Sequence, residues 1–167
     1  SDKAYETMCD IYRPLYINKN PIMHTTIETA EMIKYASNSF LALKISYINE
    51  IANLCETVGA DIHDVASAMG KDGRISDKFL HPGPGFGGSC FPKDLESLIA
   101  KSKEKNIPME TLRAAKKAND NQKAKMGTKL ENLISSSLKG KKIAVLGLSF
   151  KANTDDIRES SSIDIIE

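Results

Sequence analysis

Residues 25–59 read TTIETAEMIKYASNSFLALKISYINEIANLCETVG, a stretch with no proline and with no glycine before Gly59. The hydroxyl group of Thr25 or Thr26 can cap a helix start, and Glu28 places an acid in the opening turn. Gly59 is suited to end the same helix. The stretch therefore predicts a helix of about 30 residues, far above the usual mean of about 12. We expect so long a helix to run through the centre of a domain or through an interface.

Further helices are predicted on both sides of this one. Apolar spacing and the positions of aspartate, proline and glycine indicate helices over 2–13, 61–69, 92–105 and 108–139. The last of them places one stripe on Leu112, Ala115, Asn119, Gln122, Met126, Leu130 and Leu133. We interpret Arg74–Leu80 as one irregular helical turn. Residues 81–89 hold two prolines and four glycines, so they cannot form regular structure.

The character of the sequence changes after Gly140. Residues 142–147, KIAVLG, form a short apolar run bounded by glycine, which is typical of a buried parallel strand, and a helix is predicted from Ser160. One strand and one helix cannot bury themselves, so the residues from about 141 onward look like the truncated start of an α/β domain. We expect a mainly α-helical chain in which removal of the residues after Gly140 costs little stability.

Composition excludes several classes of protein. A net charge of +1 does not provide the basic surface that nucleic acids or anionic membranes attract, and no apolar run is long enough to span a bilayer. Three cysteines, Cys9, Cys55 and Cys90, are odd in number and widely spaced. They predict neither a disulfide framework nor a metal site, which favours a reducing cytoplasm.

One face of the long helix combines apolar and polar residues. Eight positions that step by four and three share it, namely Ala30, Lys34, Asn38, Leu41, Ile45, Ile48, Ala52 and Cys55. If this face is buried, Lys34 and Asn38 need hydrogen-bonding partners or a ligand. A lysine that reaches solvent and an asparagine bonded within the core would explain the same pattern, so the spacing leaves both interpretations open.

Cys90 lies between the glycine-rich loop and a helix that Pro92 begins. The positive end of the helix dipole and the cation of Lys93 both stabilise a thiolate, the form of cysteine that attacks carbonyl carbon. Asp94 falls in the first turn of that helix, where its carboxylate can orient water. A small buried cysteine in a tight loop is the alternative for Cys90, and it is the interpretation we favour for the other two cysteines.

Gly83, Gly85 and Gly88 match the G-x-G-x-x-G spacing of a dinucleotide-binding fingerprint, but the context of that fingerprint is missing. The fingerprint follows a strand and opens a helix. Here the preceding residues 77–81 are polar, and Pro84 lies inside the turn. We therefore reject an NAD site at this loop and expect its glycines to let backbone amides approach a substrate.

Three segments resemble the UDP-glucose/GDP-mannose dehydrogenase family, in the family's order and over nearly the whole chain. They are FGGSCFPKD at 86–94, EMIKYASN at 31–38 with Asn49-Glu50, and GLSFK at 147–151 with TDDIRES at 154–160. The resemblance implies an NAD-dependent enzyme that oxidises the C6 alcohol of a nucleotide sugar to a carboxylate in two hydride transfers. It also implies a homodimer formed through the long helix.

The same resemblance divides the chain into three parts. Residues 1–20 would be the end of an NAD-binding domain or a linker helix, and 21–139 the helical central domain. Residues 140–167 would be the truncated start of a Rossmann-like α/β domain that binds the nucleotide sugar. Without an NAD-binding domain, the chain alone is expected to be inactive.

The resemblance also implies roles for individual residues. Cys90 would form a thiohemiacetal and then a thioester, Lys34 and Asn38 would hold the C6 oxygen, and Asp94 would position or deprotonate water. The implied substrate contacts are Phe79, Leu80, His81, Pro82, Gly83, Gly87, Arg74, Phe150 and Lys151, with Arg74 reaching the substrate of the neighbouring subunit. Lys93 and Arg158 match positions that contact NAD, and no metal is implied.

Ser89, before the cysteine, favours UDP-glucose as the substrate, because the N-acetylhexosamine branch of the family usually has a histidine there. GDP-mannose and a UDP-N-acetylhexosamine remain alternatives. A non-catalytic helical dimerisation module is a second interpretation, against which the polar pair on the long helix counts. A cysteine hydrolase is disfavoured because no histidine general base is evident near Cys90.

Overall fold

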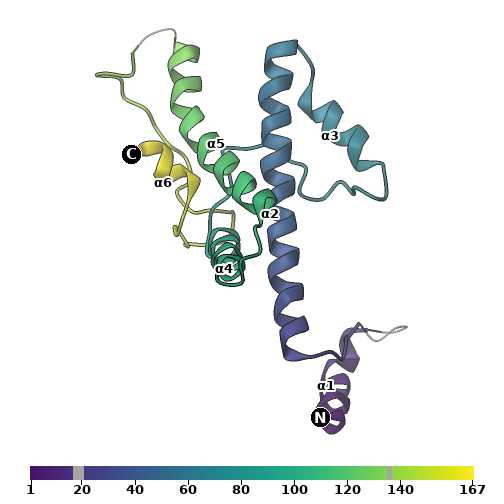
Figure 1. Cartoon of the computed structure of the whole chain (residues 1–167). Helices are drawn as coiled ribbons and strands as arrows, with labels where there is room; N and C mark the ends of the chain where they lie inside the picture. Colours follow the sequence, from purple (N-terminus) through teal and green to yellow (C-terminus); the bar gives the residue numbers. More distant parts are fainter. Residues whose placement is uncertain (17–20, 135–136) are drawn as a thin grey trace. The chain divides into compact units, whose positions relative to one another are not determined.

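The computed structural model describes residues 1–16, 21–134 and 137–167, and helices dominate these ranges (Figure 1). They are α1 (Asp2–Tyr12), α2 (Ile27–Val58), α3 (Ile62–Gly70), α4 (Phe91–Glu104), α5 (Glu110–Ile134) and α6 (Ser161–Ile166), with a short 3-10 helix at Arg13–Leu15. No strand occurs in the described part of the chain. The expected mainly α-helical class is confirmed.

The chain forms two compact units, Ser1–Lys34 and Tyr35–Glu167. In the first unit, the ring of Tyr5 on α1 stacks on His24 with centroids 4.6 Å apart, which joins α1 to the segment before α2. The hydroxyl of Thr26 accepts a hydrogen bond from the Thr29 amide at 3.2 Å, so the predicted threonine cap of α2 is confirmed. The expected domain boundary near residue 20 lies outside the described residues.

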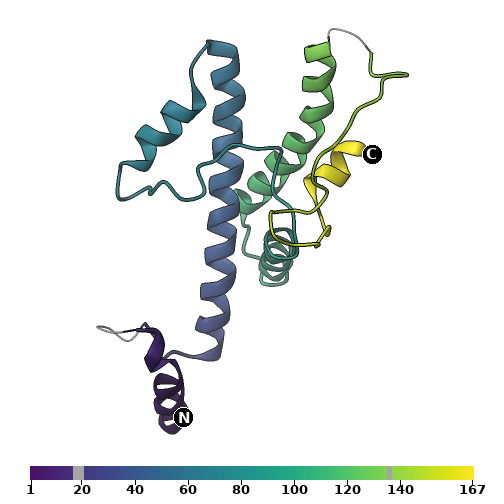
Figure 2. The same ribbon diagram turned by 180° about the vertical axis from the view of Figure 1, so that it is seen from behind.

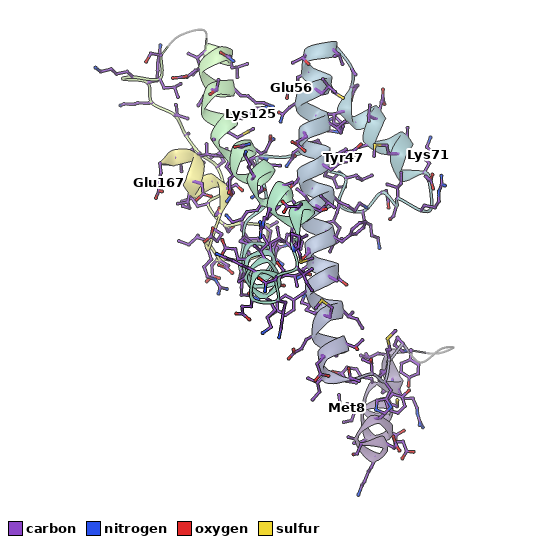
Figure 3. The ribbon with its side chains drawn as sticks, viewed as in Figure 1. Met8, Tyr47, Glu56, Lys71, Lys125 and Glu167 are labelled. Atoms are coloured by element: carbon purple, nitrogen blue, oxygen red, sulfur yellow. The ribbon has the colours of Figure 1, made fainter. Side chains whose placement is uncertain are left out.

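In the second unit, α3 and α5 lie on opposite sides of α2 (Figures 1 and 2). The Asp61 carboxylate caps α3 by accepting from the His63 amide at 2.7 Å, as its position in the sequence predicts. The Ser46 hydroxyl donates to the Ala115 carbonyl of α5 at 2.8 Å. Near the end of α2, Glu56 turns toward α5 (Figure 3) and pairs with Lys129.

The hydrophobic core lies where α2, α4, α5 and the glycine-rich loop meet. Its central cluster contains Ala42 of α2, Phe86 of the loop, Leu95 of α4 and Ala115 of α5. A loop side chain thus fills the middle of the core, and the loop that precedes Cys90 is a packed element of the fold. None of the described helices is both long and apolar enough to cross a membrane.

The expectation of a helical turn over Arg74–Leu80 is wrong, because these residues form turns and bends without a helix. Ser76 and Phe79 have φ angles of 65° and 63°, a left-handed conformation that an α-helix cannot contain. Lys44 of α2 also takes the carbonyl groups of Ile75, Ser76 and Lys78 as hydrogen-bond acceptors, so these carbonyls are not available for helical bonds.

The strand expected over residues 142–147 is also absent: 141–148 have no regular structure and are exposed, with Leu146 94% exposed. A strand needs a neighbouring strand to satisfy its N–H and C=O groups, and the described residues supply none.

The residues after 148 do not behave as the sequence suggested. Ser160 and Ser161 are buried, and α6 packs along α5, where Asp164 forms an ion pair with Lys123. Because of these contacts, we now expect removal of the residues after Gly140 to cost more stability than the sequence suggested. The apolar run at 142–147 predicted burial for residues that are exposed. The buried contacts come instead from the polar segment that follows, at Ser160 and Ser161.

Candidate active site around Cys90

Cys90 is the N-cap residue of α4, as its position before Pro92 predicted, and its side chain is exposed. The Asp94 amide donates to the Cys90 carbonyl at 2.9 Å, which closes the first turn of the helix. The Ser89 hydroxyl lies 3.9 Å from the Cys90 sulfur. The thiol therefore sits at the positive end of a helix dipole and faces solvent, the surroundings expected of a reactive cysteine.

Asp94 holds a carboxylate at the centre of a small polar cluster. It is 2% exposed, and its hydrogen-bond donors include the side chains of Asn38 and Lys93. The Asn38 amide donates to Oδ2 at 2.5 Å, and the Lys93 ammonium donates to Oδ1 at 2.5 Å. Each carboxylate oxygen thus has a charged or polar donor, which removes the penalty for burying an ionised group. The cluster joins α2 to the first turn of α4, four residues after Cys90.

Two cations act on this region. The hydrogen bond to Asp94 raises the pKa of Lys93 above its ordinary range, and the nearby Cys90 adds a smaller contribution. The pKa of Arg158 is raised mainly by its bond to Asp156, again with a smaller contribution from Cys90. Both side chains are largely exposed, at 65% and 70%. Cys90 therefore lies within electrostatic reach of two cations that stay charged at neutral pH and can still meet an anionic ligand.

Side-chain amides hold the glycine-rich loop in place. Asn119 of α5 makes two bonds with Phe86: its Oδ1 accepts from the backbone amide at 2.7 Å, and its Nδ2 donates to the carbonyl at 3.0 Å. Gly83 is held in a similar way, because its amide donates to Asn49 Oδ1 at 2.7 Å and its carbonyl accepts from Gln122 Nε2 at 2.8 Å. The sequence-based rejection of a dinucleotide fingerprint agrees with this arrangement, since no strand precedes the loop and its backbone is bonded to protein.

The C-terminal segment closes the other side of the loop. The Gly88 amide donates to the Arg158 carbonyl at 2.9 Å, and the Ser161 hydroxyl donates to the Gly85 carbonyl at 2.8 Å. The Phe150 ring lies against Gly88, where an added Cβ would come within 2.5 Å of it. Glycine is therefore required at this position by close contact as well as by its φ of 83°.

The structure brings together most of the predicted site residues of the second unit. Phe79 packs edge-on against Phe91 at the start of α4, with ring centroids 6.1 Å apart, and Leu80 is buried. Lys151 lies over the Phe150 ring at 5.3 Å. Pro82 is half-buried, and His81 is exposed. Phe79, through Phe91, and Phe150, through Gly88, therefore both lie close to the residues that flank Cys90.

Two predicted residues, Lys34 and Arg74, are exposed. Lys34 belongs to the first unit, and Ala30 on the same helical face is exposed as well, so this end of the face agrees with the interpretation of a lysine that reaches solvent. Burial of that face begins at Asn38, the residue that contacts Asp94 of α4. The Arg74 side chain is 89% exposed and forms an ion pair with Asp72, two residues earlier in the chain.

Sequence reasoning did not single out the amides that hold the loop, Asn49, Asn119 and Gln122. A signal was present, because two of them occupy an otherwise largely apolar stripe of the predicted helix over 108–139. A buried amide on such a stripe needs a partner, and a nearby loop without regular structure has unpaired backbone groups to offer. In the described ranges, no group of three or more His, Cys, Asp or Glu side chains is arranged to hold a metal ion.

Comparison with known proteins identifies the family of this chain. The family model described as the UDP-glucose/GDP-mannose dehydrogenase family, central domain, matches residues 28–121, which is more than half of the chain. The chain belongs to the UDP-glucose/GDP-mannose dehydrogenase family. The model of the family's UDP binding domain matches residues 144–167.

Individual relatives extend the similarity to nearly the full chain. It is 51% identical over 165 residues to the UDP-glucose 6-dehydrogenase of Rhizobium meliloti (strain 1021), covering 99% of this chain and 38% of that protein. It is 51% identical over 166 residues to UDP-glucose 6-dehydrogenase YwqF of Bacillus subtilis (strain 168), covering 99% and 37%. The chain thus spans little more than a third of the length of these relatives.

Solved structures show the same arrangement of helices. A UDP-glucose dehydrogenase from the archaeon Pyrobaculum islandicum superposes with a TM-score of 0.89 at 37% identity, covering 99% of this chain and 37% of that one. A UDP-D-ManNAc dehydrogenase from Pyrococcus horikoshii gives a TM-score of 0.76 at 29% identity, covering 96% and 38%. The fold of this segment is therefore shared by family members whose names give different sugars.

Proposed function

We propose that this chain is part of an NAD-dependent nucleotide-sugar 6-dehydrogenase that oxidises the C6 alcohol of UDP-glucose to the carboxylate of UDP-glucuronate. The observation that carries the proposal is the exposed Cys90 thiol at a helix start, four residues before a buried carboxylate held by Asn38 and Lys93. The relatives named as UDP-glucose 6-dehydrogenases support UDP-glucose as the substrate.

In the proposed reaction, the Cys90 thiolate attacks the C6 aldehyde and forms a thiohemiacetal, whose oxidation leaves a thioester on the same sulfur. Water then cleaves the thioester, and Asp94, the nearest buried carboxylate along the helix, positions or deprotonates that water. The Asn38 amide donates to Asp94 and so lies one helical turn from Cys90 in the same cluster. We propose that Asn38 and Lys34 stabilise negative charge on the C6 oxygen.

Two NAD molecules would accept the two hydrides, one each. Lys93 and Arg158 suit the binding of the anionic pyrophosphate of this cofactor, because both are exposed cations within electrostatic reach of Cys90. The matched family models are the central and UDP binding domains, so these two residues would contribute to the edge of an NAD site.

The nucleotide sugar would lie along Phe79–Gly83 and Gly87, between these residues and the C-terminal Phe150 and Lys151. Hydrogen bonds hold both segments: the Gly83 amide donates to the Asn49 side chain, and the Gly88 amide donates to the Arg158 carbonyl. Such preorganisation lowers the ordering cost of substrate binding. The match of residues 144–167 to a UDP binding domain supports placing the nucleotide on this side.

We also propose a homodimer formed through α2. Phe40, Tyr47 and Leu54 are 61%, 48% and 58% exposed and recur every seven residues, so they form one apolar stripe on the helix. Phe40 and Tyr47 line a groove of about 370 Å³, together with Arg74 (Tyr47 is labelled in Figure 3). In a dimer formed through this face, we propose that Arg74 reaches the substrate of the partner subunit.

The three free cysteines suit a reducing cytoplasm, where we place the enzyme.

The dimer can be tested on this chain. The chain has a mass of 18.3 kDa, and sedimentation velocity of the wild type should give twice this mass. Tyr47→Glu, which places a charge in the middle of the stripe, should return the single mass, whereas Lys103→Glu on exposed α4 surface should not. A monomeric wild type would contradict the proposed interface.

The activity is tested with the full-length protein that contains this segment. It is incubated with NAD and, separately, UDP-glucose, UDP-galactose, GDP-mannose and UDP-N-acetylmannosamine, and NADH is counted per sugar consumed. We expect two NADH per UDP-glucose, lost in Cys90→Ala and retained in Cys55→Ala, which changes a buried cysteine away from the site. If the protein oxidises another of these sugars faster, the proposed assignment of UDP-glucose as the substrate is wrong. No turnover by a folded protein that binds NAD would favour the non-catalytic module.

A further inference from the structure

Lys44 forms a hydrogen-bonded clamp on the loop that leads to the proposed substrate residues. Its ammonium, on α2, donates to three carbonyl oxygens of one loop: Ile75 at 2.9 Å, Ser76 at 3.2 Å and Lys78 at 2.5 Å. An ammonium has three N–H donors, so the number of acceptors equals the number of donors. The side chain is half-buried, which strengthens these charge–dipole contacts relative to water.

The loop is shaped so that its carbonyls converge on this cation. Ser76 and Phe79 adopt left-handed φ angles of 65° and 63°, which are uncommon for residues other than glycine. At the base of the loop, Asp77 lies so close to Gly70 that an added Cβ would come within 2.8 Å of the Asp77 Cα. Without a cation at the centre, three carbonyl dipoles would point toward one another. The loop conformation therefore depends on the ammonium.

The clamp lies immediately before the residues that we assign to the nucleotide sugar. Phe79 and the buried Leu80 follow Lys78 directly, and the amide of Gly83 is bonded to Asn49 Oδ1. Asn49, like Lys44, belongs to α2. One helix thus holds both ends of the 79–83 segment, one end through a charged side chain and the other through a neutral amide.

We propose that Lys44 is a positioning residue for nucleotide-sugar binding: it holds Ile75–Lys78 so that Phe79–Gly83 are preformed for the substrate. This inference rests on the proposed function. Lys44 itself is not proposed to touch the substrate or the reacting atoms. Its loss should weaken sugar binding, because the ordering of the loop would then occur during binding.

The clamp is tested first without any activity measurement. Trypsin cleaves after Lys78, whose carbonyl is one of the three acceptors, so cleavage requires that the loop opens. In this chain, Lys44→Met should speed cleavage after Lys78 about tenfold, the effect of losing charged hydrogen bonds that hold the closed loop. Lys103→Met, an exposed lysine of α4, makes the same charge change and should leave the rate unchanged. Cleavage after Arg113 in α5 requires global unfolding, so it should remain far slower than cleavage after Lys78 in all three proteins.

The functional role is tested in the full-length protein, with wild-type turnover measured first. Lys44→Met should raise KM for the nucleotide sugar about tenfold while KM for NAD changes little, and Lys44→Arg, which keeps the cation, should restore most of the loss. Equal cleavage in wild type and Lys44→Met overturns the clamp. Faster cleavage with an unchanged sugar KM, or a fall in kcat with both KM values unchanged, overturns the positioning role. A wild type that oxidises no nucleotide sugar overturns the proposed function and the role of Lys44 within it, while the cleavage result still decides the clamp.

Discussion

The carbonyl oxygen of Glu159 lies 1.7 Å from the position that a Cβ atom on Gly87 would occupy. Only glycine fits at such a distance, so the loop before Cys90 and the C-terminal segment meet backbone to backbone. The next residue continues the contact, because the Gly88 amide donates to the Arg158 carbonyl. Residues separated by about seventy positions in the sequence thus support one loop, whose position sets that of the thiol.

Gly87→Ala should destabilise this chain by about 3 kcal/mol, the upper part of the usual range for forcing extra volume into a packed site. The backbone of Glu159 must move to admit the methyl group. The midpoint of urea unfolding, at unchanged slope, measures the loss. Gly73→Ala is the matched control, since no atom lies within 4 Å of its Cβ position. If the two variants are equally stable, the contact described here does not exist in solution.

Asn119→Asp should cost about 2 kcal/mol, because it removes the donor to the Phe86 carbonyl and places a carboxylate against it. The remaining oxygen can still accept from the Phe86 amide, so the loss reports the donor half of the pair. Asn121→Asp, exposed and two positions further on, should change stability by less than about 0.5 kcal/mol. A similar loss in both variants would indicate a general effect of added negative charge on α5.

The three thiols should differ in their reaction with a disulfide reagent in the folded protein. Cys90 is exposed, Cys9 is partly buried and Cys55 is 6% exposed. We expect Cys90 to react at least about tenfold faster than Cys55, which must wait for local or global opening. The fast phase should vanish in Cys90→Ser, and all thiols should react alike in denaturant. A fast phase that persists in Cys90→Ser would contradict the exposure seen here.

Asp156 should stabilise the fold down to acidic pH. Hydrogen bonds from the Arg158 side chain and amide lower the pKa of Asp156 from its ordinary value of 3.8 to about 2. A carboxyl whose pKa is lower in the folded state adds stability above its unfolded value and loses it as pH falls through the folded value. The difference in melting temperature between wild type and Asp156→Asn should therefore be constant at neutral pH and shrink between about pH 4 and about pH 2.

Asp155→Asn is the control for that titration. Asp155 is exposed and makes none of the bonds that join Asp156 to Arg158. The melting temperature of Asp155→Asn should change with pH in the same way as that of the wild type over this range. A difference for Asp156→Asn that stays constant down to pH 2 would show that the ion pair does not titrate as described.

The position of Cys90 at a helix start was predicted correctly, because a glycine-rich loop followed by Cys90 and Pro92 defines that start by local chemistry alone. The choice between a buried and an exposed Lys34 could not be made in the same way. Helical spacing shows which residues share a face, but not how far along the helix another element covers that face. Here coverage begins at Asn38, where α4 contributes Asp94.

By itself, the sequence determined the helices of this protein and the place of its thiol, because caps, glycine, proline and apolar spacing act within a few residues of one another. Tertiary structure alone decided which groups meet. Asn38 and Asp94 are 56 residues apart, and Asn119 is 33 residues from Phe86, so their pairing depends on how the helices pack. The apolar run at 142–147 makes the same point in reverse: a strand exists only when another strand accepts its hydrogen bonds, and none is present in the described part of the chain.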